Sequence, residues 1–198
     1  MKVVLADYGA GNLRSVCSAL ARAGAEPVVS SDPAEVAAAS LAIVAGVGHS
    51  ARAAAGLGPL ADVLRERVAD GRPVFGICVG LQLLFEQSDE GGEGLGLLAG
   101  RVRRLEAPTV PHMGWNELAF MRPSRILEGL DGADVYFAHS YAVQPDDEKL
   151  VVARIDHAGA VVAAVEEGVV AGVQFHPERS GAAGARALEN VLQWSRSA

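Results

Sequence analysis

Short apolar runs alternate with amphipathic segments along the first half of the chain. The apolar runs are residues 3–6, 27–30, 41–45 and 73–77. Runs of this length without regular polar alternation are typical of strands buried on both faces of a sheet. Helical spacing or helix-start residues mark 13–20, the segment that opens at Asp32-Pro33, 59–70 and 79–85. Strands that alternate with helices predict a parallel sheet connected by right-handed crossovers.

The second half of the chain is richer in strands. The pattern predicts strands over 101–106, 116–120, 135–138, 150–155, 160–166 and 169–174, followed by a helix over 182–194. Turns separate these strands, which favours some antiparallel pairs. The chain contains no internal repeat, low-complexity tract or linker. We therefore predict one α/β domain over residues 1–198, with a mixed, mostly parallel central sheet and a β-rich second half.

The charge balance narrows the class of protein. The 198 residues include 17 Lys and Arg against 24 Asp and Glu, a net charge of −7. This balance argues against binding to nucleic acid or to an anionic membrane surface through basic side chains. The longest apolar runs, 41–47 and 158–165, are much shorter than the roughly 20 residues that a membrane-spanning helix needs.

The cysteine count indicates a reducing compartment. Cys17 and Cys78 are too few for a disulfide framework. The first residues lack the apolar stretch and cleavage site of a secretion signal, because Asp7 follows only a short apolar run. We therefore expect a cytoplasmic protein with both thiols reduced. Helical spacing places Cys17 in the packing of the first helix.

Cys78 lies where a predicted buried strand meets a predicted helix, in the segment Gly76-Ile77-Cys78-Val79-Gly80. Glycines two residues before and after the cysteine permit the sharp strand-to-helix turn of a nucleophile elbow. The start of a helix favours the thiolate, and the backbone N–H of Val79 points to where an oxyanion forms. On local sequence alone, a small buried hydrophobic side chain is an equally good interpretation.

A second candidate group follows the strand predicted at 169–174. His176 and Glu178 are two residues apart, so their side chains point to the same side of an extended chain. Pro177 restricts the backbone between them. The carboxylate can then orient the imidazole, as a Cys-His-Glu triad requires. The alternative is a surface histidine beside a surface glutamate. The position of Cys78 and His176 after two predicted sheet strands favours the triad, because open α/β sheets place catalytic groups at strand ends.

Two glycine-rich loops are further candidates. The loop at 46–49 follows a third predicted strand, and its backbone can supply a second oxyanion donor. The loop at 8–12 departs from the G-x-G-x-x-G pattern because position 14 is arginine, so we expect no nucleotide cofactor.

The remaining histidines and one aromatic segment have simpler interpretations. No metal site is predicted, because no zinc-ligand spacing relates His49, His112 and His139. His157 lies in a predicted turn and is expected to be exposed. Residues 111–116 are interpreted as a turn-rich segment that exposes Met113 and Trp115, side chains that are enriched at protein interfaces.

Seven sequence motifs of the chain resemble those of a known family. They are DYGAGNLRSV at 7–16, GVGH at 46–49, GICVG at 76–80, GLQLLFE at 80–86, PHMGWNEL at 111–118, YFAHSY at 136–141 and GVQFHPERS at 172–180. They resemble class I (triad-type) glutamine amidotransferases, and DYGAGN, PHMGWN and HSY are similar to those of the glutaminase subunits of imidazole glycerol phosphate synthases. The resemblance spans nearly the whole chain. It implies a three-layer fold with helices on both faces of the central sheet.

The resemblance also implies a reaction and the residues that perform it. Cys78 would attack the carboxamide of glutamine, His176 would shuttle protons, and Glu178 would orient His176. The oxyanion and glutamine-binding positions would be Val47, Gly48, Val79, Gln82, Ser140 and Tyr141. No cofactor is implied.

The implied partner is a (β/α)8 cyclase subunit in a heterodimer. The cyclase would use the ammonia to make imidazole glycerol phosphate and aminoimidazole carboxamide ribonucleotide in histidine biosynthesis. Because 198 residues hold the glutaminase site but leave no room for a synthase domain, we expect the ammonia to be used on a separate chain.

Two positions depart from the family pattern, and two other functions stay open. Ala45 stands where the oxyanion loop commonly has proline, and Arg179 stands where lysine is frequent, which keeps the charge but not the geometry. The same triad could serve another acceptor, such as a pyridoxal phosphate synthase, although DYGAGN and PHMGWN disfavour this. A catalytically silent binding module on the same fold is the other alternative, and the intact triad counts against it.

Overall fold

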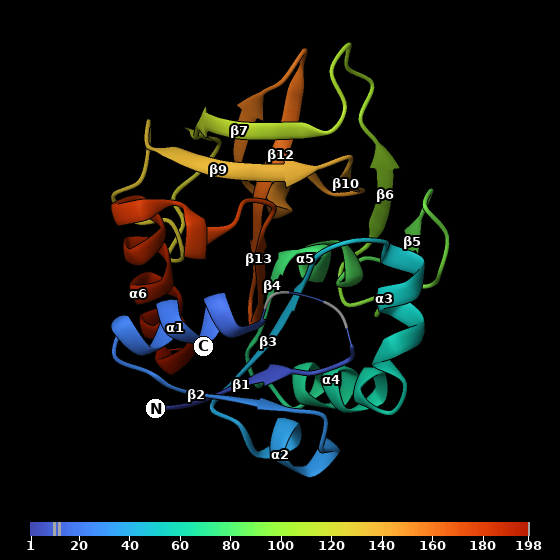
Figure 1. The fold of residues 1–198 in the computed structure, drawn as a ribbon, viewed down its shortest axis with the longest axis vertical. Helices are drawn as coiled ribbons and strands as arrows, with labels where there is room; N and C mark the ends of the chain where they lie inside the picture. Colours follow the sequence, from blue (N-terminus) through green and yellow to red (C-terminus); the bar gives the residue numbers. More distant parts are fainter. Residues whose placement is uncertain (10, 12, 198) are drawn as a thin grey trace.

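A mixed eight-stranded sheet forms the centre of the computed structural model, which describes residues 1–9, 11 and 13–197 (Figure 1). The strand order is β2-β1-β3-β4-β13-β12-β11-β8. The strands are β1 Lys2–Ala6, β2 Glu26–Ser30, β3 Leu41–Gly46, β4 Val74–Cys78, β8 Ala119–Phe120, β11 Val151–Asp156, β12 Ala160–Glu167 and β13 Val170–Val173. The five strands from β2 to β13 pair in parallel, and β12, β11 and β8 continue the sheet antiparallel. The predicted mixed, mostly parallel sheet is confirmed.

Helices cover both faces of this sheet, as predicted. The α-helices are α1 Leu13–Arg22, α2 Pro33–Ala38, α3 Ser50–Leu57, α4 Leu60–Ala69, α5 Val79–Leu83 and α6 Gly181–Ser197. Figure 1 shows α1 beside α6 on one side of β3 and β4, with α3 and α5 on the other. Helix α3, whose residues SARAAAGL are mostly small, was not predicted from the sequence. Among the described residues, no helix is both long and apolar enough to cross a membrane.

Two small sheets complete the β-rich half. One contains β10 Tyr141–Pro145, β6 Gly100–Arg104 and β5 Gln87–Ser88, and the other pairs β7 His112–Glu117 antiparallel with β9 Asp134–His139. The interpretation of 111–116 as turns is therefore wrong, and the strand predicted at 116–120 is divided between β7 and β8. Non-local pairing with β9, from His112 opposite His139 to Glu117 opposite Asp134, makes this segment a strand. β5 and β10 were also not predicted.

A buried arginine closes the end of the short helix α2. Arg67 on α4 is 2% exposed and donates to the carbonyl oxygens of Val36, Ala37 and Ala39 at 3.0 Å each. It also donates to Pro73 O at 3.0 Å. Burial, with the nearby Arg72 charge, lowers the pKa of Arg67 to about 10, so the guanidinium is still charged at neutral pH. Arg67 thus joins α2, α4 and the start of β4.

Replacing Arg67 with methionine is expected to lower the melting temperature by about 6–12 °C, because unpaired buried carbonyls cost about 3 kcal/mol. Thermal unfolding followed by circular dichroism measures the change. Arg186→Met, at an exposed position on α6, is the matched control and is expected to unfold like the parent chain. Equal melting temperatures for both variants would show that the Arg67 contacts contribute no net stability.

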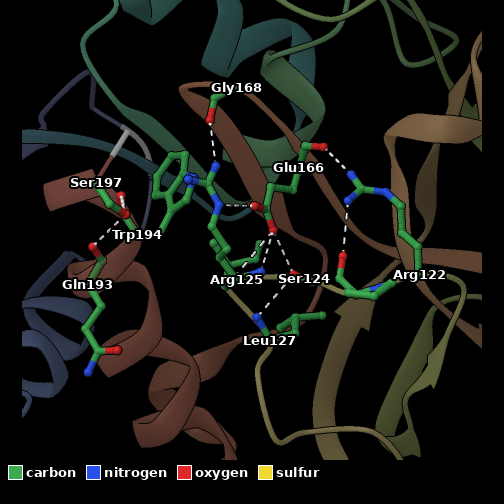
Figure 2. Close-up of polar contacts among 11 residues, drawn as sticks. Arg122, Ser124, Arg125, Leu127, Glu166, Gly168, Gln193, Trp194 and Ser197 are labelled. Carbon is green, nitrogen blue, oxygen red and sulfur yellow. Dashed lines mark hydrogen bonds and ion pairs between the residues drawn. The ribbon is translucent and has the colours of Figure 1, made fainter.

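A buried carboxylate anchors the loop that leads from β8 toward β9. Glu166 on β12 is 6% exposed and lies between Ser124 and Arg125 (Figure 2). Ser124 Oγ donates to Glu166 Oε2 at 2.8 Å, and Arg125 Nε donates to Oε1 at 2.9 Å. Glu166 therefore fixes this loop to β12, the strand that pairs with β13.

Candidate active site

Cys78 sits in a strained turn between β4 and α5. Its φ is 54° and its ψ is −109°, values that a residue with a side chain rarely adopts. A Cβ on Gly76 would lie 2.7 Å from the backbone of Leu81, and one on Gly80 would overlap the carbonyl oxygen of Val44. Both glycines are therefore required by close packing, as the predicted nucleophile elbow demands. The thiol is 2% exposed, at the carboxyl end of the parallel strands.

His176 and Glu178 form a buried pair beyond β13. Their side chains are each 5% exposed, and His176 Nδ1 lies 3.0 Å from Glu178 Oε1. The backbone of His176 is fixed by its N–H, which donates to Tyr136 O at 2.8 Å, and by its carbonyl, which accepts from Ser180 Oγ at 2.7 Å. A carboxylate on Nδ1 leaves Nε2 as the nitrogen that exchanges a proton with another group.

The pKa of His176 depends on both Glu178 and Cys78. Burial alone lowers the pKa of His176, but interactions with the Cys78 sulfur and the Glu178 carboxylate outweigh burial and raise it to about 10. A histidine with this pKa is an imidazolium at neutral pH. The structure thus brings together Cys78, His176 and Glu178 from two sequence segments almost 100 residues apart.

The cysteine opens into a cleft of about 220 Å³. Its walls contain all six accessory positions expected from the sequence, namely Val47, Gly48, Val79, Gln82, Ser140 and Tyr141. Gln82 Nε2 donates to Tyr141 O at 2.9 Å, which joins α5 to β10. Gly48 has a φ of +97°, and the neighbouring Val47 side chain is 47% exposed, so this loop forms the outer wall of the cleft.

Three residues that the sequence analysis did not select also belong to this site. Glu90 and His139 line the same cleft. Gln174, fully buried just after β13, lies with Nε2 3.6 Å from Cys78 Sγ. Glu90 comes from the glycine-rich loop after α5, where no pattern marked it. Gln174 lies two residues before His176, and that spacing is a signal that could have identified it.

Tyr8 supports the strand that leads into the loop of Val47 and Gly48. Burial, together with the Cys78 sulfur, raises the pKa of Tyr8, so its hydroxyl stays protonated and donates to Ala45 O at 2.9 Å. Of the loop predicted at 8–12, positions 10 and 12 lie outside the described residues. Gly11 packs against the Ala45 carbonyl, where a Cβ would lie 2.9 Å from the oxygen.

The comparisons with known proteins agree with this geometry. The sequence profile of the family "Glutamine amidotransferase class-I" matches residues 4–193. The chain belongs to the class I glutamine amidotransferases. Its similarity extends to proteins named "Imidazole glycerol phosphate synthase subunit HisH". The one from Natronomonas pharaonis is 46% identical, covering 98% of this chain and 94% of that protein. The one from Methanothermobacter thermautotrophicus is 42% identical, covering 98% and 100%.

A solved structure described as "Crystal structure of glutamine amidotransferase" has the same fold. It superposes with a TM-score of 0.80 over 98% of each chain, at 24% sequence identity. The predicted class I glutamine amidotransferase fold is therefore confirmed, three-layer arrangement included, and the resemblance found in the sequence motifs is confirmed by the family match.

One histidine of this amidotransferase, His157, differs from the expectation. His157 is half-buried rather than exposed, because its ring lies 4.2 Å from the His112 ring and its Nε2 contacts Thr109 O at 2.9 Å. His112 Nδ1 in turn lies 3.1 Å from His139 Nε2. Burial, more than any neighbouring charge, lowers the pKa values of His112 and His139 to about 4, so both are neutral. Within 1–9, 11 and 13–197, no three His, Cys, Asp or Glu side chains are arranged to hold a metal ion.

Proposed function

We propose that this chain is the glutaminase subunit of an imidazole glycerol phosphate synthase, with residues 1–198 forming one amidotransferase domain. The function is that of the relatives named above, which match almost the whole chain. The observation that supports the chemistry best is the cleft in which the strained Cys78 lies beside the buried His176–Glu178 pair. We place the reaction in the cytoplasm, where the thiol stays reduced.

The proposed reaction begins with a covalent step at Cys78. The thiolate sulfur attacks the side-chain carbonyl carbon of glutamine, and the π electrons of the carbonyl move to its oxygen. As the tetrahedral intermediate collapses, the C–N bond breaks and the His176 imidazolium donates its proton to the departing nitrogen, which leaves as ammonia. Glu178 keeps His176 oriented throughout, because its carboxylate stays on Nδ1.

Hydrolysis of the γ-glutamyl thioester completes the cycle. His176, now neutral, takes a proton from water, and the hydroxide formed attacks the thioester carbon. The second tetrahedral intermediate expels the Cys78 thiolate and releases glutamate. In both steps, we assign the oxyanion to the backbone N–H of Val79 and to the loop of Val47 and Gly48, which border the cleft beside the sulfur.

The same cleft offers groups for the amino-acid end of glutamine. Gln82 and the chain at Ser140 and Tyr141 form one wall. Glu90 borders the same cleft; its side chain is 15% exposed, and its Oε2 accepts from the backbone N–H of Ser50 at 2.5 Å. A half-buried carboxylate in a cleft for an amino acid is suited to an α-ammonium group. We therefore propose that Glu90 binds the α-ammonium of glutamine.

Glu90→Gln is expected to raise the KM for glutamine about 10- to 100-fold with little change in kcat, since a charge-assisted hydrogen bond is lost from both ground and transition states. The side-chain oxygen of the glutamine introduced at position 90 can still accept a hydrogen bond from the Ser50 N–H. Steady-state glutamate release at varied glutamine concentration measures both constants. Asp89→Asn, on the exposed neighbouring residue, is the control and should leave KM unchanged. A fall in kcat at constant KM would contradict the assignment.

The exposed face of β7 has the side chains expected of a protein-binding surface. Met113 and Trp115 are 65% and 57% exposed on this strand, and the guanidinium of Arg179 lies 4.6 Å above the ring of Tyr136 on the adjacent β9. Exposed aromatic, methionine and arginine side chains are the types enriched at interfaces. We propose that this surface, close to the cleft through Met113, binds the (β/α)8 cyclase subunit and delivers ammonia to it.

Co-purification with candidate partners tests the proposed function. We expect the chain to bind an imidazole glycerol phosphate synthase cyclase, and glutamate release to rise when the nucleotide substrate of the cyclase is added. A pyridoxal phosphate synthase subunit is the comparison. Binding to and activation by that subunit instead would overturn the assignment of the acceptor. No glutamate release with either partner would favour a catalytically silent module.

A further inference from the structure

Gln174 belongs to the site but has no role in the reaction proposed above. It is fully buried, and its backbone N–H donates to Ala163 O at 2.8 Å, which fixes it directly after β13. His176 also hydrogen-bonds to the Cys78 sulfur, so the side chains of Gln174 and His176 both reach this atom. The carboxamide nitrogen of Gln174 lies 3.6 Å from that sulfur.

A backbone carbonyl fixes which end of the Gln174 carboxamide faces the sulfur. The oxygen of Tyr141 can only accept hydrogen bonds, so the atom of Gln82 at 2.9 Å from it is the amide nitrogen. The same nitrogen lies 3.3 Å from Gln174, where its partner must be the carbonyl oxygen Oε1. The Gln174 NH₂ group is thereby turned toward Cys78. A flipped carboxamide would set two NH₂ groups against each other and an oxygen against a thiolate.

The Tyr141 carbonyl oxygen, which accepts from Gln82, also contacts a histidine. His139 Nδ1 lies 2.9 Å from Tyr141 O, and since a carbonyl cannot donate, Nδ1 carries the proton. His139 Nε2 then accepts from His112 Nδ1 at 3.1 Å. Both imidazoles are neutral, as their lowered pKa values indicate. The orientation of the two carboxamides thus has a single consistent solution.

We propose that Gln174 is a positioning residue that donates a hydrogen bond to the Cys78 sulfur and holds it as a thiolate facing the cleft. A buried anion is stabilised by hydrogen-bond donors. Gln174 adds a second donor to the one that His176 supplies. Gln82 lines the cleft, so the series Tyr141–Gln82–Gln174 connects the glutamine-binding wall to the nucleophile. This inference rests on the proposed function, because it assigns the thiolate a part in glutamine hydrolysis.

Two variants separate the donor from the shape of the side chain. Gln174→Glu keeps the oxygen that accepts from Gln82 but turns a carboxylate oxygen toward the sulfur, and Gln174→Met keeps the length without any donor. Gln193→Met, at an exposed position on α6, is the matched control. Alkylation of Cys78 by iodoacetamide as a function of pH, followed at the Cys78 peptide by mass spectrometry, reports on the thiolate in the chain itself. Kinetics in the complex with the cyclase and its nucleotide report on turnover.

For both Gln174 variants we expect alkylation at neutral pH to slow at least about 10-fold, with its pH profile moved to higher pH. We also expect kcat to fall about 10- to 100-fold while the KM for glutamine stays within about twofold. Gln174→Glu should show the larger changes, because the carboxylate repels the thiolate.

Unchanged alkylation and kcat in either variant would overturn the inference. A loss that merely follows a lowered melting temperature would also overturn it, because Gln174 would then be a packing residue only. Cys78→Ala, measured beside these variants, separates a failure of the proposed function from a failure of the role assigned to Gln174. If Cys78→Ala keeps glutaminase activity, the proposed function fails. If it is inactive while the Gln174 variants behave like Gln193→Met, only the present inference fails.

Discussion

Cys78→Ala is expected to reduce glutamate release about 10⁴- to 10⁶-fold in the activated complex, the range found when a triad nucleophile is removed. Alanine removes the only atom at this turn that can form the γ-glutamyl thioester, while the small side chain still fits the elbow. Glutamate release is measured with saturating glutamine, the cyclase and its nucleotide. Covalent labelling by diazo-oxo-norleucine, read by mass spectrometry, should disappear in the same variant.

Cys17→Ala is the matched control for this prediction. Cys17 is half-buried on α1 and packs against the hydrophobic core, away from the cleft. Its replacement should leave glutamate release and labelling unchanged. Native glutamate release by Cys78→Ala would show that this cysteine is a packed side chain, which is the alternative that local sequence left open. Loss of activity in both cysteine variants would point to a defect of folding.

The parts of the fold that could be predicted from the sequence are those with strong local signals. The runs at 41–45 and 73–77 correspond to β3 and β4, whose residues are all buried. The helix start at Asp32 is confirmed, because its side chain accepts from the N–H of Ala34 at 2.9 Å. In contrast, α3 buries only Ser50, Ala53 and Leu57, a face too small to produce a clear apolar period.

The strands that the sequence failed to predict depend on distant partners. β7 exposes its apolar residues Met113 and Trp115 and turns His112, Gly114 and Asn116 inward, so its sequence does not show an apolar buried face, and pairing with β9 makes it a strand. β10 similarly pairs with β6, some 40 residues earlier in the chain. Short strands in small, half-exposed sheets have few buried side chains, and tertiary contacts therefore override the local pattern.

The candidate site was predictable wherever a residue follows a parallel strand. Cys78, the loop at 46–49 and His176 all follow neighbouring strands, so the topology brings them to the same edge of the sheet. Glu90 and His139 come from a loop and from a small sheet, where sequence offers no such rule. Their places depend on how these segments fold back over Cys78.

The last prediction concerns the carboxylate that orients the histidine. Glu178→Gln is expected to lower kcat about 10³- to 10⁴-fold, because a carboxamide cannot hold the imidazolium on Nδ1 as a carboxylate does. It also removes one of the two groups, Cys78 and Glu178, whose interactions raise the pKa of His176, so this pKa falls. The imidazolium that protonates the departing nitrogen is then lost at lower pH. The alkaline limb of the kcat profile should therefore move to lower pH, and glutamate release measured between pH 6 and pH 10 checks this.

The raised pKa of His176 also makes the stability of the fold depend on pH. A histidine whose pKa is higher in the folded than in the unfolded chain stabilises the fold most below the unfolded value of 6.5, and this contribution disappears as pH rises through the folded value of about 10. Glu178→Gln should thus lower the melting temperature more at pH 6 than at pH 10. Glu189→Gln, on the exposed side of α6, removes the same charge elsewhere and should show no such dependence. A melting-temperature difference that is constant with pH would mean that Glu178 does not act through the charge of His176.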